Sequence, residues 1–285
     1  MNVELTIERR MRDALGDLTR AERQLATHIL GHYPMSALGS ISALAKAAEV
    51  STPTVVRLVQ KLGFRGYPDY RKSLRAEVET MLVTPLSRDK GGAGGHILDQ
   101  FAERVVVNLQ ATLGLIDRAD FDGAARLLAD PKRRVYALGG RVTHAMADYF
   151  VTLMTVARPD VSLIPGLSSA WPPALLDMKK GDLLVVFDIR RYENTVLQIT
   201  ELAREHGAEV ILITDRWVSP AATHARYTLA CQIEAPSPWD STVPILVVVE
   251  TLLAAVQGLT WQVTEARLKQ VEALHARSRL FRTKT

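Results

Sequence analysis

The most constraining feature of this sequence is an alternation of short apolar runs with amphipathic stretches after residue 97. Five runs rich in β-branched residues are typical of buried strands, at residues 133–139, 160–166, 181–188, 208–215 and 226–232. Stretches with helical periodicity lie at residues 143–157, 194–207 and 242–257. Strands separated by helices predict a doubly wound, mainly parallel sheet with helices on both faces.

A second feature divides the chain near residue 90. The segment TPLSRDKGGAGGH, residues 84–96, is rich in Gly and charge and has no apolar period, which is typical of a linker. The segments before it have helical patterns throughout. With 285 residues the chain is long enough for two ordinary domains. We therefore predict an all-α N-terminal domain at residues 1–80, a linker at 81–97 and an α/β domain at 98–285.

Within the N-terminal part, the segment ISALAKAAEVSTPTVVRLVQKLGF, residues 41–64, has the pattern of a helix-turn-helix. The apolar face of its first helix comprises Ile41, Leu44, Ala45 and Ala48. Ser51 or Thr52 suits the N-cap of the second helix, and Pro53 suits its first turn, so about three residues join the two helices. A Gly is often found in such a turn, whereas Glu49 stands near that place here.

The second helix of this motif predicts contacts with DNA, because its N-terminal end enters the major groove in helix-turn-helix proteins. Hydroxyl groups can bond to bases or phosphates, Arg57 can contact guanine in a bidentate manner, and cations further along suit phosphates. Residues 57–75 hold six cations against the single acid Asp69, in a chain of net charge +4. The alternative is an ordinary helical hairpin with a solvated polar face. The predicted DNA contacts are Ser51, Thr52, Thr54, Arg57, Lys61, Arg65, Tyr67 and Arg71.

These residues also carry a resemblance to a known family. The segment LTRAERQLATHILGHYP and the longer SISALAKAAEVSTPTVVRLVQKLGFRGYPDYRKSL are similar to the N-terminal domain of the RpiR/MurR family of bacterial transcriptional regulators. The most specific part is VS-x-x-TVVR followed by KLGFRGYPDYRKSL. The resemblance implies a helix-turn-helix domain, a linker and a sugar-isomerase-type (SIS) effector domain. It also implies a homodimer or homotetramer that responds to phosphorylated sugars.

The loops that would bind the effector depart from the family pattern. In the common SIS form one strand ends in Gly-x-Gly-x-Ser and a later one in Ser-x-Ser-Gly-x-Thr, and both loops cradle the phosphate. In the first loop of this chain Gly139 matches the first Gly, Arg141 stands at the second Gly and Thr143 at the Ser. In the second loop the four positions are taken by Asp188, Arg190, Arg191 and Glu193.

Two interpretations of these loops remain open. In one, Arg141, Arg190 and Arg191 converge on an anionic ligand, since guanidinium groups form bidentate bonds to phosphate or carboxylate. In the other, Arg190 or Arg191 pairs with Asp188 or Glu193, and the site is lost. The predicted effector-binding residues are Gly139, Gly140, Arg141, Thr143, Asp188, Arg190, Arg191, Glu193 and Asp215.

Together these observations predict a regulator that binds double-stranded operator DNA and senses a small anionic carbohydrate, either a sugar phosphate or a sugar acid. The alternatives are an isomerase-like enzyme and a DNA-binding protein whose SIS domain only dimerises. No acid–base pair stands out, so we expect no enzyme, and we expect no cofactor. No Cys/His cluster has metal-ligand spacing, so we expect no metal site. The apolar runs are too short to span a membrane, and the single Cys231 fits a reducing cytoplasm.

Overall fold

The computed structural model describes residues 6–31, 33, 39–82 and 95–279, with residues 79–82 described as backbone only. The chain forms two compact units, Met1–Arg88 and Asp89–Thr285. Helix α5 of the first unit ends at Leu82 and helix α6 of the second begins at Ile97, so most of the predicted linker, residues 83–94, lies outside the described residues.

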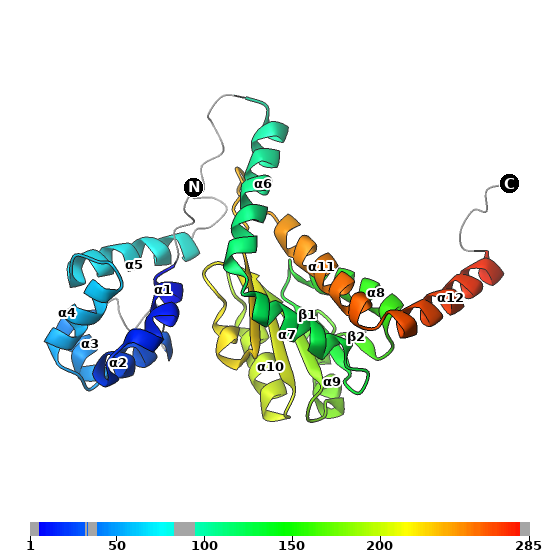
Figure 1. Ribbon diagram of the computed structural model, residues 1–285, viewed down its shortest axis with the longest axis horizontal. Coiled ribbons are helices and arrows are strands. Elements are labelled where there is room, and N and C mark those ends of the chain that lie inside the picture. Colours follow the sequence, from blue (N-terminus) through cyan, green and yellow to red (C-terminus); the bar gives the residue numbers. More distant parts are fainter. Residues whose placement is uncertain (1–5, 32, 34–38, 83–94, 280–285) are drawn as a thin grey trace. The chain divides into compact units, whose positions relative to one another are not determined.

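The first unit is helical in its described part, as predicted (Figure 1). Its elements are α1 (Ile7–Ala14), η1 (Leu15–Asp17), α2 (Arg20–Gly31), α3 (Ile41–Ala47), α4 (Thr52–Lys61) and α5 (Tyr67–Leu82). Leu25 of α2, Leu58 of α4 and Tyr70 of α5 are completely buried in one apolar core. The apolar period of each helix therefore turns one face of that helix inward.

Local capping fixes where the helices of the motif begin. The Ser51 side chain accepts a hydrogen bond from the backbone N–H of Thr54, so Ser51 is the N-cap of α4 as predicted. Thr19 and Glu22 form a reciprocal capping box at the start of α2. Between α3 and α4 the chain turns at Glu49 with a φ of 54°. This left-handed conformation explains why Gly is favoured at that point of a turn.

The second unit is built around a five-stranded sheet with the order β2-β1-β3-β4-β5, and every pairing is parallel. The strands are β1 (Val135–Gly139), β2 (Val161–Leu163), β3 (Leu183–Asp188), β4 (Glu209–Asp215) and β5 (Tyr227–Cys231). The helices are α6 (Ile97–Leu115), α7 (Arg118–Ala129), α8 (His144–Ala157), η3 (Ser168–Ala170), α9 (Pro172–Asp177), α10 (Asn194–Glu205), η4 (Pro220–His224), α11 (Val243–Leu259) and α12 (Trp261–Ser278). Each predicted strand is present, whereas α6, α7 and α9 were not predicted.

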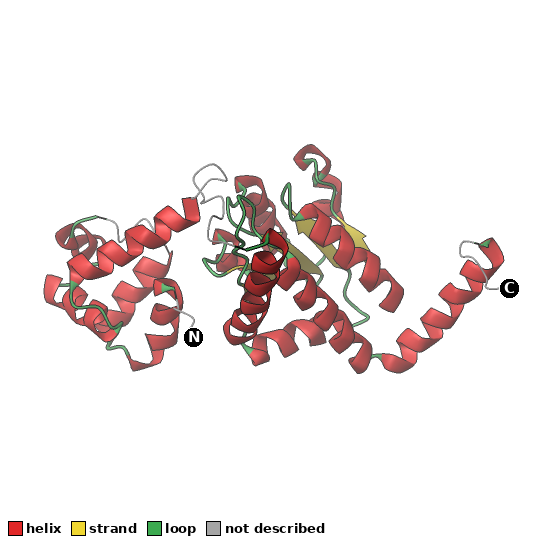
Figure 2. Ribbon diagram, turned by 90° about the horizontal axis from the view of Figure 1, so that it is seen from above, coloured by secondary structure: helices red, strands yellow, loops and turns green. Residues whose placement is uncertain are grey.

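Alternating side chains divide the sheet into two buried faces, which is the arrangement predicted for a doubly wound sheet. Helices lie on both sides of the strands (Figure 2). On one face Val185 and Ile211 pack against α7, α8 and α11. On the other face Val186 and Leu212 pack against α10 and η4. Because both faces are covered, β3 is buried along its whole length, and its loop emerges only at the carboxyl edge.

Helix α12 extends away from the rest of its unit (Figures 1 and 2). It covers no face of the sheet, although its first turns pack on α8, where Arg267 donates to the carbonyl of Thr155 at 2.9 Å. Thr264 is its buried residue, and Trp261 and Leu274 are more than half exposed. In the described part of the chain no single helix is long and apolar enough to cross a membrane; α11 and α12 meet that test only together, and they are bent by 107°.

Candidate DNA-binding helix and effector loops

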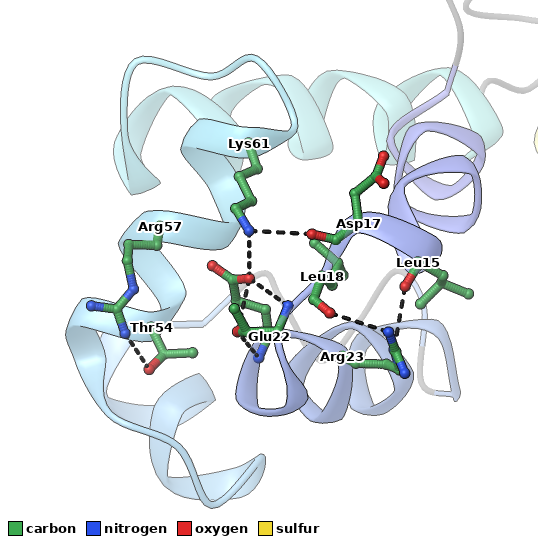
Figure 3. Close-up of polar contacts among 9 residues, drawn as sticks. Leu15, Asp17, Leu18, Glu22, Arg23, Thr54, Arg57 and Lys61 are labelled. Atoms are coloured by element: carbon green, nitrogen blue, oxygen red, sulfur yellow. Dashed lines mark hydrogen bonds and ion pairs between the residues drawn. The ribbon is translucent and has the colours of Figure 1, made fainter.

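The N-terminal end of α4 presents a mixed hydroxyl and cationic surface. Ser51, Thr52 and Arg57 are exposed there, as predicted. The guanidinium of Arg57 donates to the Thr54 hydroxyl at 3.2 Å (Figure 3). That hydroxyl lies 2.8 Å from the Ser51 hydroxyl. This contact uses one of the five N–H donors of an arginine, so the others are available to a base or a phosphate.

Two of the predicted DNA contacts are not presented at the surface. Thr54 is 4% exposed and faces the core of the unit, where its hydroxyl serves the cap of α4. Tyr67 is 6% exposed, and its hydroxyl donates to the carbonyl of Gly39 at 3.0 Å. The expectation that Thr54 lies exposed at the N-terminal end of α4 was therefore wrong, and the burial of Tyr67 does not favour its predicted contact with DNA. Thr54 instead orients Arg57, and Tyr67 holds the start of α5 in the core.

Lys61, at the end of α4, forms an ion pair inside the domain. Its Nζ lies 2.7 Å from Oε2 of Glu22, and it also donates to the carbonyl of Asp17 at 3.4 Å (Figure 3). Burial raises the pKa of Glu22, but hydrogen bonds from Lys61 and Thr19 outweigh that effect and lower the pKa to about 2. Lys61 therefore joins α4 to the capping box of α2, a contact that favours a positioning role over a phosphate contact.

The remaining cations of the basic segment lie beyond α4. Arg65 is exposed, and Asp69 accepts the backbone N–H of Arg65 at 3.0 Å, so the guanidinium of Arg65 is not used by this contact. Arg71 is half-buried on α5, and Lys72 and Arg75 are exposed on the same helix. A surface of this composition suits the phosphates of a duplex.

In the second unit the predicted effector residues gather at the carboxyl edge of the sheet. Strands β1, β3 and β4 are neighbours, and they end at Gly139, Asp188 and Asp215. Because β2 and β3 flank β1 on opposite sides, the order of the strands reverses between β1 and β3. Such a reversal is where open α/β sheets bind their ligands.

Glycine is required at the end of β1. A Cβ on Gly139 would collide with the backbone of Thr143 and His144, where the chain doubles back to begin α8. Thr143 is 3% exposed, and its hydroxyl donates to the carbonyl of Phe187 at 2.6 Å. Thr143 thus ties the β1 loop to β3, and its hydroxyl does not point outward as a ligand contact would require.

The carboxylate of Glu193 crosses from the β3 loop to the β1 loop. Its Oε1 accepts the backbone N–H of Arg141 at 2.6 Å. A Cβ placed on Gly140 would lie 2.7 Å from the same oxygen, so the absence of a side chain there allows the carboxylate to approach the backbone. The side chain of Arg141 is exposed.

Arg190 is folded into the protein. Its side chain is 4% exposed, and its guanidinium lies 3.8 Å from the ring centroid of Trp217. One nitrogen lies 3.3 Å from Asp240 and 3.9 Å from Glu234, both in the segment between β5 and α11. The next residue, Arg191, has a φ of 65° and an exposed side chain. Arg190 therefore does not converge with Arg141 and Arg191, and its acidic partners differ from the two that were predicted.

Two buried carboxyl groups lie below these loops. Asp188 is 3% exposed and accepts the Ser219 hydroxyl at 2.5 Å; burial and the neighbouring Asp215 raise the pKa of Asp188 to about 7, despite that hydrogen bond. Asp215 is completely buried, and burial raises its pKa as well. It accepts the backbone N–H of Arg190 at 2.5 Å and the Tyr192 hydroxyl at 2.7 Å. Both aspartates therefore brace the β3 loop from beneath.

Several residues that shape this edge could not be recognised from the sequence. Trp217, Tyr192, Asp240 and Glu234 were not predicted, although Trp217 follows a strand end by only two residues. Tyr192 lies at the far end of the β3 loop, and Glu234 and Asp240 lie in the segment after β5. Their roles could therefore not be assigned from sequence spacing. Among the described residues no three His, Cys, Asp or Glu side chains are grouped so as to hold a metal ion.

Comparison with known protein families matches both halves of the chain. Residues 4–81 match the helix-turn-helix domain of the rpiR family, and residues 127–255 match the SIS domain. The fold and the two matches define a helix-turn-helix protein with a C-terminal SIS domain. The chain belongs to the RpiR family.

Relatives of established name match most of this chain. The HTH-type transcriptional regulator HexR of Pseudomonas aeruginosa is 28% identical over 272 residues, which cover 90% of this chain and 92% of that protein. HexR of Escherichia coli is 26% identical and covers 83% of this chain. The bifunctional protein glk of Paraburkholderia xenovorans is 31% identical over 72% of this chain, but this chain spans only 32% of it.

Solved structures resemble the fold at lower identity. The sugar isomerase domain of an RpiR transcription factor from Sphaerobacter thermophilus has a TM-score of 0.59 at 20% identity, and it covers 63% of this chain. The NanR protein of Vibrio vulnificus, solved in complex with ManNAc-6P, has a TM-score of 0.54 at 19% identity and covers 95% of this chain. These likenesses confirm the SIS fold that the strand order shows.

Proposed function

We propose that this protein is a transcriptional regulator that binds operator DNA through α4 and senses an anionic sugar derivative at the β1 and β3 loops. Relatives named as transcriptional regulators over nearly the full length support the first part. The neighbour solved with a sugar phosphate supports the second. Because operator DNA lies in the cytoplasm, this function implies that the protein works there.

The observation that carries DNA binding is the exposed N-terminal end of α4. Ser51 and Thr52 present hydroxyls there, and Thr54 holds the guanidinium of Arg57 beside them. A second helix of this kind contacts base edges with its first turns, and an arginine in that place reads guanine. Arg65, further along, is left to contact the backbone of the duplex.

Fluorescence anisotropy on the DNA upstream of its own gene tests this assignment. Arg57→Ala should weaken specific binding about 10- to 100-fold, since a bidentate base contact is worth about 1–3 kcal/mol. Arg65→Ala should weaken specific and random DNA alike and reduce the salt slope by about one. Arg126→Ala, an exposed arginine on α7, is the charge-matched control and should leave the affinity unchanged. Equal affinities for Arg57→Ala and Arg126→Ala would contradict the assignment.

An enzymatic function finds less support. Glu250, the acid inside α11, accepts the Tyr149 hydroxyl at 2.8 Å and is exposed, so it lies in a surface hydrogen bond. Isomerisation requires a carboxylate or His beside the two reacting carbons. Turnover of aldose and ketose phosphates by the full chain is the direct test, and we expect none above background.

Self-association is the remaining part of the proposal. Helices α6 and α12 carry apolar side chains that their own unit leaves open, including Leu98 at 68% and Val106 at 54% on α6, and Leu274 at 60% on α12. An isolated helix of this length is marginal in water, and burial of its apolar side chains stabilises it. A second copy of the chain would bury them, and a dimer would present two α4 helices to a two-fold operator.

A further inference from the structure

We propose that Glu193 is a built-in occupant of the anion position in the β1 loop, and that an anionic effector must displace it. This inference rests on the proposed function, because it concerns how the same loops take their ligand. It assigns Glu193 the role of a specificity-determining residue. Its carboxylate competes with phosphate for the backbone amide of Arg141.

The first support is the position of the contact. Oε1 of Glu193 accepts the Arg141 N–H at 2.6 Å, in the loop that leads into the 14-residue helix α8. Amides at the beginning of a helix favour negative charge, and they bind phosphate in many α/β proteins. The contact also joins the loops of β1 and β3, between which the strand order reverses. A carboxylate thus stands at the place where the architecture accommodates a ligand anion.

The second support is that nothing local explains the direction of this side chain. Glu193 is the N-cap residue of α10, and an N-cap side chain usually accepts an amide of its own helix. Glu193 makes no such hydrogen bond, and its carboxylate instead reaches across to the β1 loop. Gly140 makes room for it, because a Cβ there would lie 2.7 Å from Oε1.

The third support is the fixed path of the β3 loop. Asp188 accepts the backbone N–H of Glu193, and Asp215 accepts the backbone N–H of Arg190. Both carboxyl groups are buried, so the loop is fixed by its backbone while Glu193 itself is only half-buried. The carboxylate can therefore swing away without unfolding the loop. Its departure would free the Arg141 amide, in a pair of loops that also carry the exposed residues Arg141 and Arg191.

The test compares phosphate binding by full-length wild type and Glu193→Gln. Inorganic phosphate is the probe, and the dissociation constant comes from the phosphate-dependent rise of the melting temperature of the second unit. Removing the charge weakens the internal hydrogen bond and removes repulsion of phosphate, so Glu193→Gln should bind phosphate about tenfold more tightly. Glu201→Gln, an exposed glutamate on the same α10, is the matched control and should behave as wild type.

A second variant, Glu193→Asp, keeps the inference testable if Glu193→Gln fails to fold. Glu193→Asp keeps the charge but is one methylene too short to reach the Arg141 amide from the same backbone, so it should also bind phosphate more tightly than wild type. Equal phosphate affinities in wild type and both Glu193 variants, or no binding by any of them, would overturn the inference. The outcome is separable from the proposed function. If a sugar phosphate changes the operator affinity of wild type but Glu193→Gln shows no gain in phosphate affinity, only the inference is contradicted. If Glu193→Gln shows that gain but no sugar phosphate changes operator binding, the proposed function is contradicted.

Discussion

Replacing Arg190 by Ala should destabilise the second unit strongly, whereas the same change at its neighbour Arg191 should not. The Arg190 side chain is 4% exposed, stacks at 3.8 Å on Trp217 and lies 3.3 Å from Asp240. A desolvated cation–π contact contributes about 2 kcal/mol, and removing one partner of a buried ion pair costs about 3–5 kcal/mol. Asp240 retains some exposure, and the cation–π and ion-pair contributions overlap. We therefore expect Arg190→Ala to lower the free energy of unfolding by about 3 kcal/mol.

Urea unfolding followed by tryptophan fluorescence measures this directly, because all four Trp residues lie in the second unit. With a slope of about 2 kcal/mol per molar urea, Arg190→Ala should lower the midpoint by about 1.5 M. Arg191→Ala removes the same charge from an exposed side chain and should shift the midpoint by less than about 0.3 M. Similar midpoints for the two variants would refute the buried, paired placement of Arg190.

Three further predictions follow from single residues. Glu49→Gly should raise the stability of the first unit by about 0.5–1 kcal/mol in far-UV thermal melts, because φ at Glu49 is 54°, and Glu49→Ala should bring no gain. Burial raises the pKa of Asp188 to about 7 from 3.8, so the free energy of unfolding of wild type should fall as pH rises from 4 to 7 and stay constant above pH 7. Asp188→Asn should lack that part of the pH dependence in urea titrations. Leu274→Asp on α12 should lower the mass measured by light scattering towards that of the monomer. An unchanged mass would show that α12 is not part of the proposed interface between two copies.

The sequence predicted the elements well where a pattern was local. The five strands are continuous apolar runs, and the start of α4 follows from Ser51 and Pro53, so neighbouring residues carry the information. Helices α6 and α7 were missed, since they precede the first strand and no loop motif marks them. The exposure of Thr54 was predicted wrongly and the burial of Tyr67 was not foreseen, because both depend on how α4 and α5 pack in the core.

The candidate effector site was predicted in composition but not in geometry. The sequence placed charged residues at the ends of β1, β3 and β4, and they do gather at one edge. It could not show that the left-handed Arg191 separates its side chain from that of Arg190. Nor could it pair Arg190 with Asp240 or Glu193 with the Arg141 amide, since about 50 residues separate each pair.

The most direct test of the whole account is the affinity of the full-length protein for its upstream DNA, measured by anisotropy during titration with sugar phosphates and sugar acids. The account predicts that at least one of these anions changes the operator affinity about tenfold, and that Arg57→Ala reduces the preference for this DNA over random sequence about 10- to 100-fold. An operator affinity that no such anion changes, or a protein that binds operator and random DNA equally, would contradict it.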